Sequence, residues 1–166
     1  MKKIFAFVLC FVLLFCGCDK KAEPYFDKAP EGITFTANYQ YYFTDDTYIQ
    51  VRWMNDTDKT FHFTDEFRLE KLSGNTWYLV SKKEAPVFNE EYYHYVEPHS
   101  KSSSIYHVDL YTDALVEGTT YRISTSCRDD EENYYQLYAE FICDNEAAED
   151  EISALMESSS KSGETT

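Results

Sequence analysis

Histidine and carboxylate side chains gather in the stretch 81–100, where the chemistry to consider is metal binding. His94 and His99 are accompanied there by three glutamates between residues 90 and 97. A zinc site needs neutral imidazoles that are held by hydrogen-bonding partners, commonly at the spacing of HExxH or paired CxxC motifs. Neither motif occurs in the sequence, and there is no Asp-rich calcium loop. We therefore predict no metal and no cofactor, and we interpret the stretch as a solvated acidic loop.

Nucleophilic catalysis by serine, histidine and aspartate is the second chemistry to consider. His107 and Asp109 share one face of a predicted strand, and Ser102 to Ser104 precede them. A catalytic triad also needs a nucleophile on a sharp turn and an oxyanion hole. No GxSxG-type turn occurs in the sequence, so we predict polar side chains on an exposed strand and no catalytic residues.

Paired carboxylates suggest sugar hydrolysis as a third chemistry. They occur in two acidic segments, at 45–46 and at 129–132. Hydrolysis requires two carboxyl groups that face each other across about 5–9 Å, whereas adjacent residues of a surface turn point apart. We interpret these residues as solubilising turn residues and predict that the protein is not an enzyme.

Clustered tyrosines are the strongest sign of a binding function. One cluster lies at residues 39–42, and the other comprises Tyr92, Tyr93 and Tyr95. Tyrosine provides a large, rigid contact area with a polar tip, which suits recognition loops on a rigid scaffold. Tyr92, Tyr93 and Tyr95 are therefore candidate ligand-binding residues. The alternative is that these rings pack over the edges of a sheet and shield them.

The first eighteen residues predict where the protein acts. Two lysines at positions 2 and 3 precede an apolar run over residues 4–15, and Gly17-Cys18 follows it. This pattern is typical of a secretory signal, because about 20 apolar residues are needed to cross a bilayer. Gly17-Cys18 resembles the lipobox of bacterial lipoproteins, in which the cysteine is acylated and becomes the new N-terminus. The resemblance implies lipidation of Cys18 and a location on the outer side of a cell membrane.

The charge of the chain excludes one class of partner. The formal net charge is −15, and removal of residues 1–17 with their two lysines leaves −17. Such acidity repels nucleic acid and anionic lipid head groups. We therefore predict no nucleic-acid binding. The predicted partners are the membrane, through the N-terminal lipid, and an unidentified protein or glycan ligand.

The residues between 33 and 143 alternate with period two, which predicts strands. The clearest case is the segment 49–53, where Ile49, Val51 and Trp53 alternate with polar residues. Fifteen tyrosines and twelve phenylalanines also favour pleated, half-buried surfaces. About seven to nine short strands, each followed by turn residues, predict an all-β antiparallel sandwich.

The sequence divides into four predicted segments. A lipoprotein signal peptide covers 1–17, a lipidated polar linker covers 18–32, the sandwich covers 33–143, and an acidic Ser-rich tail covers 144–166. We expect the tail to be disordered, with at most a marginal helix near its start, because it contains too little apolar surface to fold by itself.

Four motifs, in this order, resemble those of bacterial immunoglobulin-like domains of secreted lipoproteins. They are an N-x-T-D-K turn at 55–59, a strand pair at 67–80, a G-x-x-Y-R-I strand at 118–123 and a closing aromatic strand at 135–141. The resemblance implies an immunoglobulin-like sandwich, an envelope location and no shared catalytic residues. It also implies that Trp53 lies in the core and that Tyr121 forms a tyrosine corner.

Two cysteines, Cys127 and Cys143, remain after the signal peptide in a compartment where disulfides can form. If the last hairpin turns at 130–132, Tyr121 faces Phe141 and the cysteines lie about 20 Å or more apart. A disulfide needs Cα atoms within about 7 Å. We therefore predict two unpaired thiols.

These observations together predict a non-catalytic binding or scaffolding module at the cell envelope. The alternative is an accessory or inhibitor lipoprotein that docks to an envelope enzyme or transporter. A hydrolase on a sandwich fold is disfavoured because no catalytic constellation can be assembled from the sequence.

Overall fold

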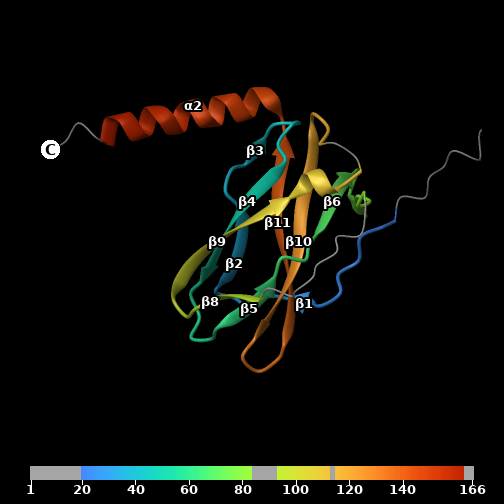
Figure 1. Ribbon diagram of the computed structural model, residues 1–166, viewed down its shortest axis with the longest axis vertical. Helices are drawn as coiled ribbons and strands as arrows, with labels where there is room; N and C mark the ends of the chain where they lie inside the picture. Colours follow the sequence, from blue (N-terminus) through green and yellow to red (C-terminus); the bar gives the residue numbers. More distant parts are fainter. Residues whose placement is uncertain (1–19, 84–92, 113–114, 163–166) are drawn as a thin grey trace, which may run out of the picture.

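Two β-sheets face each other in the computed structural model, which describes residues 20–83, 93–112 and 115–162 (Figure 1). Helix α2 (Asn145–Ser162) lies across one end of the sandwich. The prediction of an all-β, immunoglobulin-like antiparallel sandwich is confirmed.

The smaller sheet has three antiparallel strands in the order β2 (Ile33–Ala37), β4 (Tyr48–Asn55) and β9 (Ser100–His107). Alternate residues of β4 are buried, as the sequence pattern predicts. Trp53 is completely buried at its centre, and its Nε1 donates a hydrogen bond to Ser104 Oγ at 3.2 Å. The predicted core tryptophan is confirmed.

The larger sheet has eight strands and is mostly antiparallel. Its main path runs β1 (Asp27–Lys28), β11 (Tyr134–Cys143), β10 (Thr119–Asp129), β5 (Phe61–Thr64) and β8 (Tyr93–Val96). Farther along β10, β6 (Arg68–Ser73) pairs with it and with β7 (Thr76–Leu79), and β3 (Tyr41–Tyr42) pairs in parallel with the end of β11. The described residues thus contain more strands than predicted, because β1 and β3 are two-residue strands that alternation cannot reveal.

Aromatic rings fill the space between the sheets. Trp53 stacks on Phe63 from the opposite sheet at 4.2 Å between ring centroids, and Phe35 lies 4.6 Å from Trp53. Nearer to α2, Tyr121 stacks on Phe141 at 5.7 Å. Such pairs add to the free energy of area burial, so packing across the sheets holds a core that contains no disulfide.

The last hairpin follows the predicted register. Tyr121 on β10 pairs with Phe141 on β11, and the chain turns directly after Asp129. Cys127 and Cys143 are therefore far apart, and both are free and buried. Burial raises the pKa of each thiol to about 12, which leaves little thiolate at neutral pH.

The predicted tyrosine corner is present where the chain enters β10. The backbone N–H of Val116 donates a hydrogen bond to Tyr121 Oη at 3.1 Å. Between them Gly118 has φ 72°, a left-handed conformation that glycine adopts without steric cost. The bond fixes the loop onto the start of β10.

Residues 20–28 differ from the expected spacer because they pair with the larger sheet. The N–H of Leu79 donates to Lys20 O, and the N–H of Ala22 donates to Trp77 O, both at 2.8 Å. This pairing satisfies backbone groups of the edge strand β7, which would otherwise need water as a partner. The folded body therefore includes residues 20–28, well before Ile33.

The acidic tail also differs from the expected disorder, because residues 145–162 form α2. Asp144 Oδ1 accepts a hydrogen bond from the N–H of Ala147 at 3.0 Å, as an N-cap does. The Glu151 carboxylate accepts hydrogen bonds from the backbone N–H groups of Gln40 and Tyr41 at 3.2 and 3.0 Å. Tertiary contacts thus stabilise a helix that its composition alone does not favour. Within the described part of the chain, no helix is both long and apolar enough to cross a membrane.

Candidate binding face

Four side chains form a straight row across the outer surface of the larger sheet. Tyr95 on β8 pairs with His62 on β5, and His62 pairs with Arg128 on β10. Arg128 in turn pairs with Tyr134 on β11. Directly paired residues of antiparallel strands lie on the same face of a sheet. Phe26 extends the row, because its ring stacks on Tyr134 at 5.3 Å. We call these five residues the transverse row.

The aromatic members of the transverse row are open to solvent. Tyr95 is 58% exposed and Tyr134 is 48% exposed, whereas Val96, next to Tyr95, is buried and Tyr135, next to Tyr134, is partly buried against the core. Neighbouring strands lie about 4.8 Å apart, so the distance from Tyr95 to Tyr134 is about 14 Å. The row is long enough for an extended ligand to contact several of its side chains at once.

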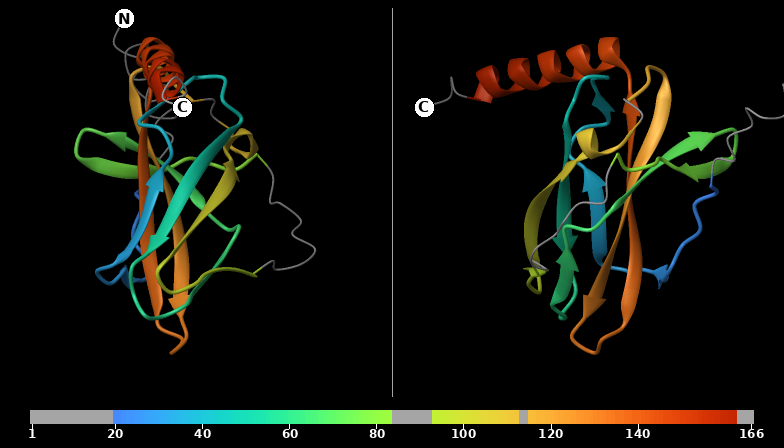
Figure 2. Two further views of the ribbon diagram at one scale, coloured as in Figure 1. Left: turned by 90° about the vertical axis from the view of Figure 1, so that its left-hand side faces the viewer. Right: turned by 45° about the vertical axis from the view of Figure 1, so that its right-hand side comes forward.

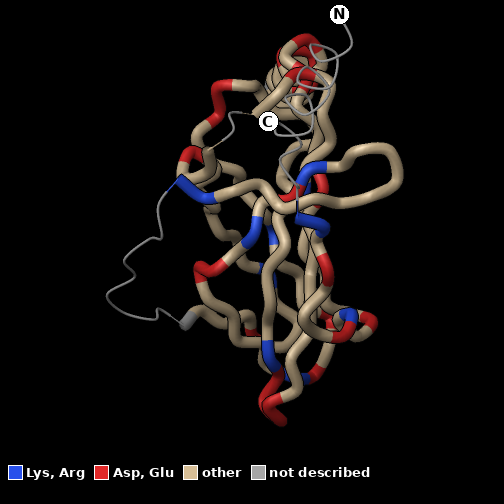
Figure 3. The backbone as a smooth tube through the Cα atoms, turned by 90° about the vertical axis from the view of Figure 1, so that its right-hand side faces the viewer, with Lys and Arg blue, Asp and Glu red and all other residues tan. Residues whose placement is uncertain are grey.

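The charged members of the row are paired with acidic residues of the β10–β11 turn. Arg128 forms an ion pair with Glu132, and His62 Nε2 lies 3.4 Å from Asp130 Oδ1. Acidic residues gather at this turn and along α2 (Figure 3). Because Arg128 and His62 each lie beside a carboxylate, the row offers hydrogen-bond donors and acceptors side by side.

Two shallow hollows flank the row. One has a volume of about 420 Å³ and lies between β5 and the β10–β11 hairpin; its lining includes His62, Arg128 and Tyr134. The other, of about 770 Å³, lies between the N-terminal segment and the hairpin; its lining includes Phe26, Asn133 and Tyr134. The row with its hollows is thus a broad, open surface, which suits a chain-like ligand better than a small enclosed one.

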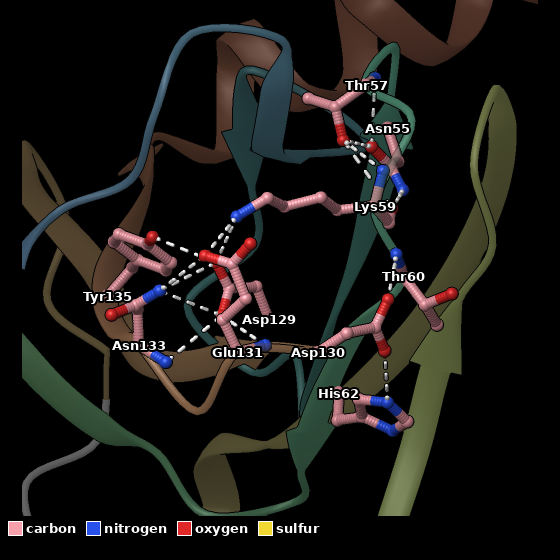
Figure 4. Close-up of polar contacts among 10 residues, drawn as sticks. All are labelled: Asn55, Thr57, Lys59, Thr60, His62, Asp129, Asp130, Glu131, Asn133 and Tyr135. Carbon is pink, nitrogen blue, oxygen red and sulfur yellow. Dashed lines mark hydrogen bonds and ion pairs between the residues drawn. The ribbon is translucent and has the colours of Figure 1, made fainter.

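A buried carboxylate holds the β10–β11 turn beside the row (Figure 4). Asp129 is completely buried and accepts hydrogen bonds from Lys59 Nζ at 2.9 Å and from Tyr135 Oη at 3.1 Å. The backbone N–H groups of Glu131 and Asn133 also donate to it. Burial raises the pKa of Asp129, but the hydrogen bonds from Lys59 and Asn133 outweigh it and hold the pKa well below its usual range. The hydrogen bonds to Asp129 and to Glu131 in turn raise the pKa of Lys59.

A buried asparagine holds the other side of the row. Asn55 Nδ2 donates to Lys59 O at 2.7 Å, Glu97 O at 2.9 Å and Val96 O at 3.2 Å. Its Oδ1 accepts from the N–H of Thr57 at 3.0 Å. These bonds tie the turn between β4 and β5 to the end of β8, and therefore fix the strand that carries Tyr95.

The contacts of Asp129 and Asn55 are not evident in the sequence, which predicts solubilising turn residues at 129–132 and a turn at 55–59. The correction for Asp129 is that it faces inward, because the Asn133 side chain at i+4 and two backbone N–H groups converge on its carboxylate. An Asp side chain that accepts from the backbone N–H two residues on, here that of Glu131, is typical of a turn. Its partner Lys59, 70 residues earlier in the chain, gives no such signal.

A second polar cluster lies on the same sheet, where β6, β7, β10 and β11 meet. Glu70 is completely buried, and its Oε2 lies 2.6 Å from Arg122 Nε. The Arg122 guanidinium stacks between the rings of Trp77 and Tyr138, at 4.2 and 4.0 Å from their centroids. Glu70 Oε1 lies 3.2 Å from Arg68 Nη2 without an aligned hydrogen bond. This cluster stiffens the sheet that carries the row.

The structure describes the predicted site residues unequally. Tyr95 lies in the transverse row, and Tyr93 opens β8, but the Tyr93 side chain, Tyr92 and Cys18 lie outside the described residues. In the other tyrosine cluster Tyr42 is buried and donates a hydrogen bond to Gln50 O at 3.0 Å. Burial raises the pKa of Tyr42 to about 12, so this ring belongs to the core.

The histidines do not converge. His94 lies 2.9 Å from Asp65 and His99 lies 2.9 Å from Asp58, in separate exposed pairs. Over the described residues no three His, Cys, Asp or Glu side chains come together as metal ligands would.

The suggested serine triad is not assembled either. His107 Nδ1 lies 3.6 Å from Asp109 Oδ1, on the 3₁₀ helix η2 (Val108–Leu110) that follows β9. Ser104, in contrast, has its Oγ at Trp53 inside the sandwich. Ser102 and Ser104 alternate to the other face of β9 from His107. Ser103 shares the outer face with His107 but lies four residues away along the strand, about 13 Å, so none of these three serines is in place as a nucleophile.

Comparison with known proteins identifies the sandwich. Residues 29–142 match the family model of the bacterial Ig-like domain. No curated protein matches the chain.

Proposed function

Because this chain belongs to the bacterial Ig-like domain family, we propose that it is a lipid-anchored binding module of the cell envelope. Its rigid sandwich displays the transverse row, on which a protein or glycan ligand lies. The observation that carries the proposal is the row itself, which consists of exposed aromatic and paired polar side chains supplied by four adjacent strands.

The chemistry of the row suits binding. Exposed rings such as Tyr95 and Tyr134 provide flat apolar area for sugar rings or for aromatic and aliphatic side chains. The Arg128–Glu132 pair lies between them and can both donate and accept hydrogen bonds. The row is also rigid, since Asp129 and Asn55 fix both of its ends. A preorganised surface loses little conformational entropy when it binds.

The proposed anchor acts directly on the folded domain. Cys18 lies two residues before Lys20, whose carbonyl is bonded to β7. An acylated Cys18 therefore leaves almost no free tether, and the β6–β7 end of the larger sheet is held close to the lipid head groups. Stable anchoring needs more than one acyl chain, and a lipoprotein modification of Cys18 meets this requirement.

The anchor is tested by mass spectrometry of the chain from the membrane fraction. We expect an acylated N-terminal Cys18 and no leader peptide. A Cys18→Ser variant should leave the membrane fraction. A wild-type chain with an unmodified Cys18 or a retained leader contradicts the anchor.

The binding face is tested separately on glycan and protein arrays with immobilised chain. We expect a saturable signal that falls about 30-fold for Tyr134→Ala, since a central aromatic contact contributes about 2 kcal/mol. Val116→Ala is the control, because Val116 is 55% exposed but precedes β10, at the end of the hairpin opposite the row.

The outcome of the arrays separates the proposed functions. A ligand whose affinity is unchanged by Tyr95→Ala and Tyr134→Ala contradicts the row as binding site. Stoichiometric recovery of one envelope enzyme or transporter with the wild-type chain, without any array signal, favours the accessory or inhibitor role instead.

A further inference from the structure

The outer face of the smaller sheet has an unusual composition for so acidic a chain. Its three strands contain no Asp or Glu, although the sequence has 30 acidic residues. Ten side chains alternate outward from β2, β4 and β9; they are Thr34, Thr36, Tyr48, Gln50, Arg52, Met54, Lys101, Ser103, Ile105 and His107. We call this surface the acid-free face.

Apolar and basic residues are mixed on the acid-free face. Tyr48 is 49% exposed and Ile105 is 55% exposed, on adjacent strands at the end where β4 begins and β9 finishes. Arg52 and Lys101 lie farther along the same strands and are exposed. All four side chains are exposed, although Arg52 Nη2 donates a hydrogen bond to Asn38 Oδ1 at 2.8 Å. The face therefore suits a partner that is acidic and also carries apolar side chains.

Helix α2 has those properties. Its first turns dock on β3, with Ala148 buried and Glu151 bonded to the backbone of Tyr41. The docked side of the helix continues with Ile152 and Leu155, which follow Ala148 at helical spacing. Leu155 is 46% exposed and the adjacent Met156 is 69% exposed.

The acidic residues of α2 accompany this apolar stripe. Glu149 and Asp150 are exposed on the same turns as the docked residues. Acids near the start of a helix are favoured by its dipole, so their presence alone does not show a partner. The helix dipole does not account for the apolar residues Leu155 and Met156, which lie beyond these acids and are exposed.

The helix also extends toward the side of the molecule on which the acid-free face lies. In Figure 2 α2 crosses the end of the sandwich and projects beyond the smaller sheet, and in the left view it is seen end-on above β2, β4 and β9. The residues 152–162 form a projecting arm of about 16 Å at 1.5 Å rise per residue. Stacked sheets lie about 10 Å apart. An arm of this length can therefore reach a second molecule that packs against the smaller sheet.

We propose that two copies of this chain associate through these surfaces, with α2 of each copy against the acid-free face of the other. Both halves of the contact belong to one chain, as the two-fold interface of a homodimer demands. The arm of each copy projects past its own smaller sheet at the α2 end of the sandwich, so two opposed faces bring each arm to the partner. Exposed Leu155 and Met156 then meet Tyr48 and Ile105, and the acids of α2 meet Arg52 and Lys101.

The association is measured by sedimentation velocity on residues 19–166, which retain every described element. We expect a monomer–dimer equilibrium at micromolar concentrations. Leu155→Ser with Met156→Ser on the arm, and Lys101→Glu with Ile105→Ser on the face, should each weaken dimerisation at least about tenfold. All four side chains are exposed, so the melting temperature of each variant should stay close to that of the wild type.

Matched controls lie on other surfaces. Val116→Ser removes an apolar side chain that is 55% exposed, and Lys28→Glu reverses a charge on β1. Both should leave the dimer unchanged. A charge-restoring variant, Lys101→Glu with Glu149→Lys and Asp150→Lys, should dimerise more tightly than Lys101→Glu alone.

Three results would overturn the proposal. The first is a wild-type chain that stays monomeric at every concentration. The second is a dimer that neither the arm variant nor the face variant weakens. The third is a dimer that the Val116 and Lys28 controls weaken equally. Because the measurement uses no ligand and no lipid, each of these results leaves the proposed binding row and the anchor unaffected.

Discussion

Replacing Arg122 by methionine removes the main partner of a carboxylate that has no access to water. Glu70 is completely buried, and its two oxygens lie 2.6 Å from Arg122 Nε and 3.2 Å from Arg68 Nη2. Methionine has a similar reach and can still pack between Trp77 and Tyr138, so the substitution chiefly deletes the charge and its hydrogen bond.

The expected loss follows from these contacts. Removing one partner of a buried ion pair costs about 3–5 kcal/mol, since the other charge stays buried. Arg68 still faces Glu70, which places the effect near the lower limit. Loss of the cation–π contacts adds about 0.5–1 kcal/mol to the cost. Packing of the methionine between the two rings offsets part of this addition. We therefore expect the free energy of unfolding to fall by about 3 kcal/mol, equivalent to a melting temperature about 6–12 °C lower.

The assay is urea unfolding of residues 19–166, followed by far-UV circular dichroism. Lys28→Met is the control, because Lys28 is an exposed basic residue of β1, and it should change the unfolding free energy by less than about 0.5 kcal/mol. A double-mutant cycle with Glu70→Leu gives the interaction energy. The double variant should be less destabilised than the sum of the two single variants, because both charges leave together.

Two results would refute the reasoning. One is an Arg122→Met variant that loses less than about 1 kcal/mol, which is the net contribution of an ordinary hydrogen bond. The other is strict additivity in the cycle, because residues in direct contact should show an interaction energy of at least about 0.5 kcal/mol.

Three further predictions concern the hairpin. The pKa of Asp129 is lower in the folded chain than its usual value of about 3.9; its stabilising contribution should be complete above about pH 4 and be lost as pH falls toward the folded pKa. When urea unfolding is measured across an acidic pH series, the free energy of unfolding should therefore depend less steeply on pH in Asp129→Asn than in the wild type. An equally steep pH dependence in the two chains contradicts this. Tyr121→Phe removes the bond from Val116 and should cost about 1 kcal/mol in the same unfolding assay; no change would show that the corner contributes nothing. In residues 19–166, Cys127 and Cys143 should resist Ellman's reagent in the native state and yield two thiols after denaturation without reductant. Fewer than two would show a disulfide.

The sequence was informative wherever side-chain alternation decides the outcome. Burial of Trp53 and the pairing of Tyr121 with Phe141 follow from period two and from a single tight turn. The unpaired state of the cysteines followed from the same register. These features are local, so each can be derived from a short stretch of residues.

The transverse row could be predicted only in part. Tyr95 was a candidate because it lies in a tyrosine cluster, but His62, Arg128 and Tyr134 gave no such signal. They come together because β8 pairs with β5, and β5 with β10, in particular registers. A connection as long as the one from β7 to β8 does not fix the register of the strand that follows it.

The sequence by itself therefore determined the sandwich, its aromatic core and its closing hairpin, because each follows from alternation and turn chemistry along the chain. Tertiary structure decided whether Asp129 is exposed or buried, whether residues 20–22 are free or paired with β7, and whether the acidic tail folds. In each case the deciding partner lies far along the chain, and its position is set only once the sheets have assembled.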